Sequence, residues 1–297
     1  MKKYLGDGMM LVTASIWGSG FVVTDIALKF FNPYQTMAGR FVLATFLIII
    51  AFYRKVKKIS RSVLWKGALL GTCVYTGFIL QTVGLQYTTP SKNAFLTAVN
   101  VVIVPIIAFL IYRRRIDRYE MLGSMMALVG IGFMSLQNSL TVNIGDVLSL
   151  ACAAAFAFEI FFTNIFVHEE DSITLTIVQF VTASLLSVLT MFLTGGTPTV
   201  LEKTGMLSIF YLAVFSTAIA YLLQNIAQSY TTSIRAAIIL SMESFFGMLF
   251  SIIFLHELVT ARMILGAVLI LASVLLSEIK PSFKKKETFK RADDDIR

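Results

Sequence analysis

The residues best suited to carry function in this chain are two glutamates that lie within long apolar stretches. Glu243 shares a helix face with Gly247 and Ser251, at the spacing of successive helical turns. Glu159 has Thr163 one turn further along. A carboxyl group in hydrocarbon costs free energy unless it faces protein or water, so each glutamate predicts either a polar binding site or a paired structural group. Because buried carboxyl groups also serve as proton carriers, Glu159 is a candidate for proton coupling.

Amide and aromatic side chains in other apolar stretches join these carboxyl groups as candidates. Tyr221 and Gln224 fall on one helix face, while Gln81 and Asn100 lie in two earlier stretches. Buried amides also link helices by hydrogen bonds, so each is either site lining or structural. A further stripe at helical spacing predicts either an aromatic cavity wall or a lipid-facing surface; it comprises Thr13, Trp17, Phe21 and Thr24.

Arg40 is a basic residue inside an apolar stretch, and Asp25 lies near the end of the stretch before it. If these ends are adjacent, the two side chains form a salt bridge. The alternatives are that Arg40 extends to the polar surface or that it binds a substrate carboxylate.

The sequence lacks the motifs of common enzymes. His256-Glu257-Leu258-Val259-Thr260 has no second histidine for a zinc-protease site, and neither a phosphate-binding loop nor a Gly-x-Ser-x-Gly motif occurs. Cys73 and Cys152 both lie within apolar stretches at a spacing that suggests no metal. We therefore predict no enzymatic activity, no cofactor and no bound metal.

Composition predicts an integral membrane protein. Hydrophobic residues make up 57% of the chain and charged residues 14%, a balance that a soluble globular protein does not tolerate. Apolar stretches of roughly 20 residues are long enough to cross a bilayer. We expect ten, the seventh being the most dilute: 8–28, 35–53, 64–86, 92–111, 119–138, 145–167, 173–193, 205–228, 234–255 and 261–279.

The two halves of the chain repeat each other. Leu80-Gln81 and Tyr87-Thr88-Thr89 return as Leu223-Gln224 and Tyr230-Thr231-Thr232 at an offset of 143, and Gly6-Asp7 returns at an offset of 139. We call residues related by these offsets repeat mates; among them are Asn100 and Glu243, and Arg40 and Gln179. Five spans per copy force the second copy to enter the membrane from the opposite side.

The repeats therefore predict two inverted five-helix units, 1–138 and 139–280, followed by a charged tail, 281–297. This layout is typical of secondary transporters. Pro105 has Met248 as its mate, so we expect a helix kink in one half only.

The basic residues predict the orientation of these spans. With a cytoplasmic N-terminus, twenty Lys and Arg residues lie inside and four outside, namely Lys29, Lys92, Lys203 and Arg262. One inside loop, His168-Glu169-Glu170-Asp171, carries no Lys or Arg. We assign the net charge of +8 to orientation and to contact with anionic lipid rather than to nucleic acid.

An ordered set of short motifs resembles the EamA-type proteins of the drug/metabolite transporter superfamily. The motifs are Trp17-Gly18-Ser19-Gly20-Phe21, Ala38-Gly39-Arg40-Phe41, Tyr87-Thr88-Thr89-Pro90-Ser91-Lys92, Val104-Pro105, and Phe254-Leu255 followed by Gly266-Ala267. The resemblance covers nearly the whole chain. It implies a ten-helix carrier of the bacterial inner membrane with both termini cytoplasmic. It also implies a central cavity within helices one to four and six to nine, and export of amino acids or related metabolites. The family usually has Gly at the position of His256.

We therefore predict an all-α integral membrane protein that acts as a permease, exporting an amino acid or related amine by alternating access. The alternatives are a carrier of a lipid-linked or nucleotide-sugar substrate, and a channel or sensor. The expected partners are a small-molecule substrate, the lipid bilayer and a second copy of the chain, for which Gly123-x-x-x-Ala127 offers a close-packing face. The predicted substrate site comprises Trp17, Gln81, Asn100, Tyr221, Gln224 and Glu243, with Glu159 for protons and Arg40 as a substrate or structural charge.

Overall fold

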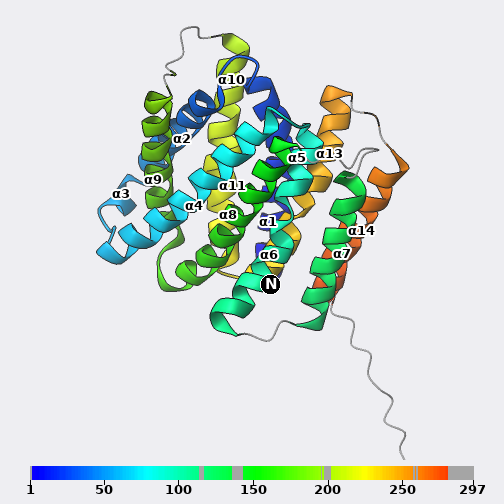
Figure 1. Ribbon diagram of the computed structural model, residues 1–297. Helices are drawn as coiled ribbons and strands as arrows, with labels where there is room; N and C mark the ends of the chain where they lie inside the picture. Colours follow the sequence, from blue (N-terminus) through cyan, green and yellow to red (C-terminus); the bar gives the residue numbers. More distant parts are fainter. Residues whose placement is uncertain are drawn as a thin grey trace, which may run out of the picture.

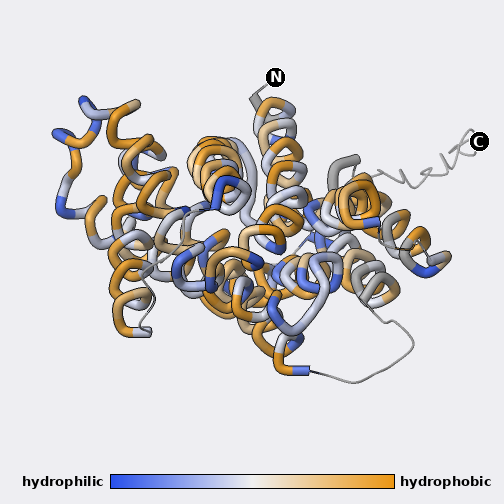
Figure 2. The backbone as a smooth tube through the Cα atoms, turned by 90° about the horizontal axis from the view of Figure 1, so that it is seen from above, coloured by the Kyte–Doolittle hydropathy of each residue, from blue (hydrophilic) through white to orange (hydrophobic). Residues whose placement is uncertain are grey.

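The protein is a bundle of long helices (Figure 1). The computed structural model describes residues 2–113, 117–135, 143–194, 196, 202–256, 258 and 260–279, so the predicted tail 281–297 lies outside the described residues. Figure 2 shows hydrophobic residues along the helices and hydrophilic residues mainly in the connections. The first half contains α1 Lys2–Ala27, α2 Pro33–Ala51, α3 Tyr53–Val56, α4 Arg61–Leu85, α5 Pro90–Thr97, α6 Asn100–Tyr112 and α7 Arg118–Ser135. The second contains α8 Ile144–Glu169, α9 Ser172–Leu193, α10 Lys203–Tyr211, η1 Leu212–Ile219, α11 Ala220–Gln228, α12 Ser233–Leu240, α13 Met242–Leu255 and α14 Ala261–Ile279.

Eight helical segments of the described chain are long and apolar enough to cross a membrane. They confirm eight of the expected spans, including the dilute seventh span at α9. The other two expected spans correspond to α7 and α14, which pack against each other at one edge of the bundle (Figure 1). Their contact is close, because a Cβ at Gly130 would lie 2.8 Å from the Gly266 carbonyl oxygen. That these two helices also cross the membrane remains a prediction.

The face of α7 that was predicted to form a homodimer is covered within the chain. Gly123 and Ala127 are both buried, and Ala127 packs in a core cluster with Ile270 of α14. The small residues of α7 therefore serve packing within this bundle.

The repeated Tyr-Thr-Thr motif has a structural cause. Thr89 and Thr232 are the N-caps of α5 and α12, and each hydroxyl accepts a hydrogen bond from the backbone N–H three residues on, at 3.3 Å. Threonine is suited to this position because its oxygen satisfies a donor that the helix leaves unpaired. The motif thus marks the start of corresponding helices in the two repeats.

Two ion pairs join the repeats at opposite ends of the bundle. Lys92 Nζ lies 2.8 Å from Asp146 Oδ2, and Arg235 Nη2 lies 2.8 Å from Asp7 Oδ2. Both cations are repeat mates, and so are both aspartates. The arrangement of one pair therefore recurs, inverted, in the other. We call the end with Lys92 the outer end and the end with Asp7 the inner end.

Both repeats have an interrupted helix at the same position. The first breaks at Ala98, between α5 and α6, and the second at its mate Ser241, between α12 and α13. At each break the backbone forms a tighter bond across three residues, both 3.1 Å long. The helix is not broken at Pro105, because α6 continues through this residue and the interruption precedes it in both halves; the kink predicted for one half stays a prediction. Interrupted helices at matching positions are typical of transporter binding sites.

The interrupted helices also end alike. Arg113 and His256 are repeat mates that cap α6 and α13 in the left-handed region, with φ of 49° and 54°. A side chain at such a position costs roughly 1–2 kcal/mol, whereas glycine adopts it freely. This geometry explains why glycine suits the position of His256.

We expect His256→Gly and Arg113→Gly each to stabilise the protein by about 1 kcal/mol, because each relieves a left-handed side chain. Thermal unfolding of the purified protein in detergent measures the effect. Leu255→Gly, one residue earlier and still helical, is the control and is expected to lower the melting temperature. A fall in melting temperature for both cap variants would contradict the expectation.

The acidic loop without lysine or arginine receives its cations from the neighbouring inside loop. Lys66 Nζ lies 2.8 Å from Glu169 Oε2 and 2.7 Å from Glu170 Oε1, and Lys55 Nζ lies 2.7 Å from Asp171 Oδ2. The two loops therefore lie at the same end of the bundle, as the predicted orientation requires. These ion pairs explain why a predicted inside loop can lack Lys and Arg of its own.

Glu170 gives these loop contacts a pH dependence. The hydrogen bond from the Lys66 ammonium, supported by Ser62, holds the pKa of the Glu170 carboxyl below its usual 4.5. The carboxylate therefore stabilises the folded state above this pH, and the contribution is lost as the pH falls through the folded-state pKa. Between pH 7 and pH 4 we expect the melting temperature to fall less steeply in Glu170→Gln than in the unchanged protein. If the melting temperature fell equally steeply with pH in both proteins, the Lys66–Glu170 pair would make no measurable contribution to stability.

Candidate functional site

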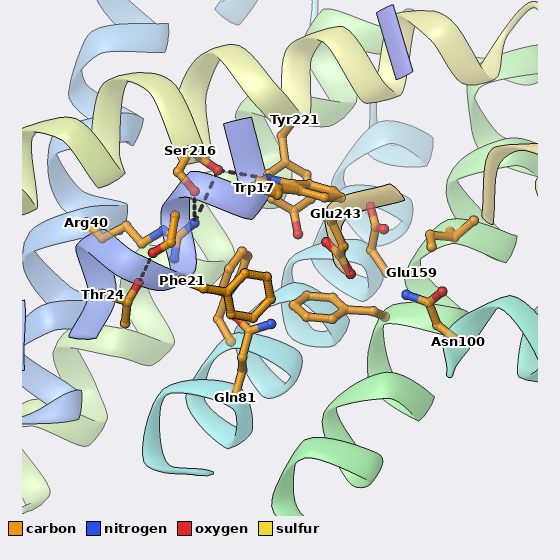
Figure 3. A pocket seen from close by; sticks show the side chains of 14 residues that line it. Trp17, Phe21, Thr24, Arg40, Gln81, Asn100, Glu159, Ser216, Tyr221 and Glu243 are labelled. Carbon is orange, nitrogen blue, oxygen red and sulfur yellow. Dashed lines mark hydrogen bonds between the residues drawn. The ribbon is translucent and has the colours of Figure 1, made fainter. Parts of the chain in front are cut away.

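A cavity with about 440 Å³ of space unoccupied by protein atoms lies in the middle of the bundle (Figure 3). It is formed by α1, α2, α4, α6, α8, η1, α11 and α13. Its lining residues combine aromatic rings, amides, hydroxyls, two carboxyl groups and one guanidinium group: Trp17, Gly20, Phe21, Thr24, Arg40, Phe78, Gln81, Asn100, Phe156, Glu159, Ile160, Ser216, Tyr221 and Glu243. Both interrupted helices contribute, through Asn100 at the start of α6 and Glu243 in the first turn of α13.

Arg40 does not form the predicted salt bridge with Asp25. Asp25 instead lies 3.6 Å from Lys29 on the same helix. Arg40 is only 2% exposed and donates hydrogen bonds to the hydroxyl of Thr217 and to the carbonyl and hydroxyl of Ser216. Its guanidinium carbon lies 3.9 Å from the centre of the Phe78 ring. The reason for the difference is packing: Arg40 faces the bundle interior, where neutral acceptors and an aromatic face hold it.

A π-helical segment shapes this side of the cavity. The helix is wound as a π-helix from Leu212 to Ile219, and the Ser216 carbonyl oxygen accepts hydrogen bonds from Trp17 Nε1 at 3.0 Å and from Arg40 Nη2 at 3.2 Å. Such segments are rare and are often found at functional sites. In the first repeat, the corresponding residues 69–76 are part of the regular helix α4, so this feature belongs to one half only.

Four aromatic side chains form a continuous wall. The ring centres of Trp17 and Tyr221 lie 5.1 Å apart, those of Tyr221 and Phe78 lie 6.0 Å apart, and those of Phe78 and Phe156 lie 5.0 Å apart. The predicted stripe on α1 thus lines the cavity rather than facing lipid, with one exception. Thr13 lies outside the lining and donates to backbone carbonyls of Met9 and Ala220.

Glu243 is a cavity-lining carboxyl group that is available to bind a ligand. It is 5% exposed, and the described residues provide it with neither a hydrogen bond nor an ion pair. Its repeat mate Asn100 lines the same cavity, as predicted, and Asn100 Oδ1 and the Tyr221 hydroxyl are buried without a hydrogen-bond partner in the described chain. Buried polar atoms are normally paired, so these three groups are suited to a polar ligand.

Glu159 is held differently, by three donors. Its Oε1 accepts from Thr163 Oγ1 at 2.9 Å and from Gln179 Nε2 at 3.1 Å, and its Oε2 accepts from Gln224 Nε2 at 3.0 Å. An ionised carboxylate accepts hydrogen bonds only, so this pattern suits the charged form. Figure 3 shows Glu159 and Glu243 together on the side of the pocket opposite Arg40.

The structure thus brings seven of the eight predicted site residues together in one cavity. Gln224 is the exception: it is fully buried behind the wall, where it bonds Glu159. Five lining residues were not predicted as site residues from the sequence: Gly20, Phe78, Phe156, Ile160 and Ser216. Phe78 and Phe156 are repeat mates of Tyr221 and Trp17, so the repeat offset is a signal that identifies them. Among the described residues, no three His, Cys, Asp or Glu side chains are grouped to hold a metal ion.

Comparisons with known proteins agree with this architecture. The sequence profile of the EamA-like transporter family matches residues 4–136 and 143–279. An uncharacterized transporter of Archaeoglobus fulgidus (strain ATCC 49558 / DSM 4304 / JCM 9628 / NBRC 100126 / VC-16) is 34% identical over 284 residues, covering 94% of this chain and 88% of its own. The uncharacterized transporter YyaM of Bacillus subtilis (strain 168) is 32% identical over 146 residues, covering 46% of this chain and 47% of its own. One crystal structure shares the fold with a TM-score of 0.76 at 13% identity, covering 93% of this chain and 96% of its own. The chain therefore belongs to the EamA-like transporter family and is a multi-pass membrane transporter.

Proposed function

We propose that this protein is a secondary carrier that exports an amino acid or a related amine by alternating access, and that a zwitterionic amino acid fits the site best. The observation that carries the proposal is the pairing of opposite charges in one cavity. Arg40 lies on one side and Glu243 on the other, with an aromatic wall between them. A zwitterion presents both complementary charges within a few bonds.

Arg40 supplies the anion-binding side. The described residues place no carboxylate within 4.0 Å of its guanidinium, so its buried charge is balanced only by neutral acceptors and the Phe78 ring. A buried charge without a counter-ion is costly. A substrate carboxylate would relieve this cost and would be recognised by a charge-assisted hydrogen bond.

Glu243 supplies the cation-binding side, with Asn100 Oδ1 and the Tyr221 hydroxyl as further acceptors. A substrate ammonium group has three donors, which matches these three oxygen-bearing groups. The rings of Trp17 and Phe78 are available for an apolar side chain.

The charged groups that line the cavity disfavour the alternative substrates, nucleotide sugars and lipid-linked compounds. Nucleotide sugars and lipid-linked phosphates carry several negative charges, and binding them calls for several basic groups. The lining contains two carboxyl groups, Glu159 and Glu243, and one basic side chain, Arg40. Zwitterions and amines therefore fit this cavity better than polyanions.

Thermal stabilisation of the purified protein tests the proposal. The panel contains neutral amino acids, their decarboxylated amines, their deaminated acids, nucleosides and sugar phosphates. A ligand that binds only the folded state raises the melting temperature by mass action. We expect stabilisation by a zwitterion, and less by its amine or its acid. Counterflow of the identified ligand in proteoliposomes then separates a carrier from a channel. Stabilisation by sugar phosphates alone would overturn the substrate class.

Proton coupling through Glu159 is part of this proposal. Glu159 lies between the cavity and its three hydrogen-bond donors, so protonation would change both. We expect export from proteoliposomes to slow when the proton gradient is collapsed at zero membrane potential, and Glu159→Gln to lose this dependence. A rate indifferent to the gradient in the unchanged protein would favour facilitated diffusion.

We also propose that the protein lies in the cell (plasma) membrane with both termini cytoplasmic. The excess of basic residues in the predicted inside segments supports this orientation. The ion pairs between the two predicted inside loops support the part of the topology that puts these loops on one side of the membrane.

A further inference from the structure

We infer that the buried polar network around Glu159 is a second half of the binding site, closed in this structure, which opens to the inner end during transport. The inference rests on the proposed function, because it assigns to this network the inward-facing state of an alternating-access carrier. The inference extends the binding site to buried residues that do not line the cavity in this structure.

The repeat symmetry of the cavity lining defines the centre of the site. Five pairs of repeat mates have both members in the lining: Trp17 and Phe156, Gly20 and Glu159, Phe21 and Ile160, Phe78 and Tyr221, Asn100 and Glu243. The centre of the site is therefore shared equally by the two repeats. In an inverted-repeat protein, what one repeat forms toward one end, the other repeat can form toward the opposite end.

Four lining residues break this symmetry. Thr24, Arg40, Gln81 and Ser216 line the cavity, whereas their mates Thr163, Gln179, Gln224 and Cys73 do not. Thr24 lies one turn before the end of α1 and Gln81 one turn before the end of α4, and both helices end toward the outer end of the bundle. The cavity therefore extends from its symmetric centre toward the outer end.

Three of the missing mates, Thr163, Gln179 and Gln224, donate hydrogen bonds to Glu159. They are fully buried. Glu159 thus extends from the symmetric centre into the inner half of the site, where these three donors bind its carboxylate, whereas its mate Gly20 has no side chain to fill the outer half. The inner half-site has the polar groups of the outer one but is closed around an internal anion.

Asn225 stabilises this closed arrangement by hydrogen bonds between two helices. Its Nδ2 donates to Thr176 Oγ1 at 2.8 Å and to Gln179 Oε1 at 2.9 Å, which joins α11 to α9. The mate of Asn225 is Thr82, whose hydroxyl has only a 3.8 Å contact to the sulfur of Met37. The inner half is therefore held by two hydrogen bonds from Asn225, whereas in the outer half Gln81 Nε2 donates to Thr97 Oγ1 at 3.2 Å and the mate of Asn225 adds no amide hydrogen bond. Helix packing alone does not require a buried hydrogen-bond network as polar as the one around Glu159. Such a network suits a surface that contacts water or substrate when the carrier faces inward.

Accessibility of single cysteines tests the inference without requiring a known substrate. In a Cys73→Ala, Cys152→Ala background, Thr24→Cys and Thr163→Cys place matched thiols in the outer and inner half-sites. Ala44→Cys and Ala183→Cys are matched controls, because these mates are fully buried in the core beside the site. The probe is the membrane-impermeant cation trimethylammonium-ethyl methanethiosulfonate, applied to oriented vesicles from either face.

We expect Thr24→Cys to react from the outer face and Thr163→Cys from the inner face, with both alanine controls unreactive. Asn225→Ala should speed the Thr163→Cys reaction by roughly fivefold, the change that one buried hydrogen bond gives to a two-state equilibrium, and slow the Thr24→Cys reaction. Thr82→Ala should not speed the Thr163→Cys reaction. If Thr163→Cys is as silent as Ala183→Cys, with and without Asn225→Ala, the inference is overturned.

Counterflow in the same vesicles separates this inference from the proposed function. Intact counterflow of a neutral amino acid with a silent Thr163→Cys would reject the inner half-site and keep the carrier. A reactive Thr163→Cys with neither counterflow nor ligand stabilisation would keep the opening and reject the proposed substrate.

Discussion

Glu243→Gln is expected to abolish substrate binding while leaving the fold intact. The carboxylate faces the cavity without a partner in the described chain, so the substitution removes the charge that a substrate ammonium group would meet. Removing one member of a buried charge pair costs about 3 kcal/mol, which is roughly a hundredfold in affinity. Because no hydrogen bond of the described fold depends on Glu243, the melting temperature without ligand should change little.

Ligand-induced thermal stabilisation and counterflow measure this effect. Glu169→Gln is the matched control, since it makes the same chemical change at a side chain that is 55% exposed at the inner end. We expect the control to bind and transport normally. If Glu243→Gln retained full flux, the cation-binding side of the site would have to be assigned to another residue.

Gly18→Ala is expected to cause the largest loss of stability among single-methyl changes in α1. A Cβ at this position would lie 2.5 Å from Phe246 Cβ and 2.7 Å from the Gly247 backbone nitrogen. Backbone cannot rotate away as a flexible side chain can, so α1 and α13 would have to separate. Overpacking of this kind costs about 3 kcal/mol. Because Trp17 and Glu243 flank this crossing, transport should fail together with stability.

Gly8→Ala provides a control in the same helix. A Cβ there would meet no heavy atom within 4 Å, so the substitution adds helix propensity without a clash. We expect it to raise stability by up to about 1 kcal/mol, opposite in sign to Gly18→Ala. Thermal unfolding in detergent compares the two, and a similar shift in both variants would show that the α1–α13 contact is not rigid.

The sequence by itself determined the membrane class, the two repeats, their inverted relation and most of the site. Long apolar stretches define spans because the backbone and side chains must suit hydrocarbon over a fixed thickness. Residues related by a repeat offset take equivalent places in the two repeats, so the offset alone predicted that Asn100 and Glu243 share one site. Polar residues in apolar spans stand out because each costs free energy unless it faces protein or water.

Only the tertiary structure decided which partner each polar side chain has. Arg40 meets Ser216 and Thr217 instead of Asp25, and Gln224 bonds Glu159 behind the wall. These contacts depend on how each helix is rotated and where it is interrupted or wound as a π-helix, and spacing along one helix carries no information on its neighbours. In the two-half site that we infer, the repeat mates Gly20 and Glu159 occupy equivalent positions, and only Glu159 has a side chain, which three donors bind on the inner side. That difference is visible in the sequence, but its consequence appears only when the two repeats are packed together.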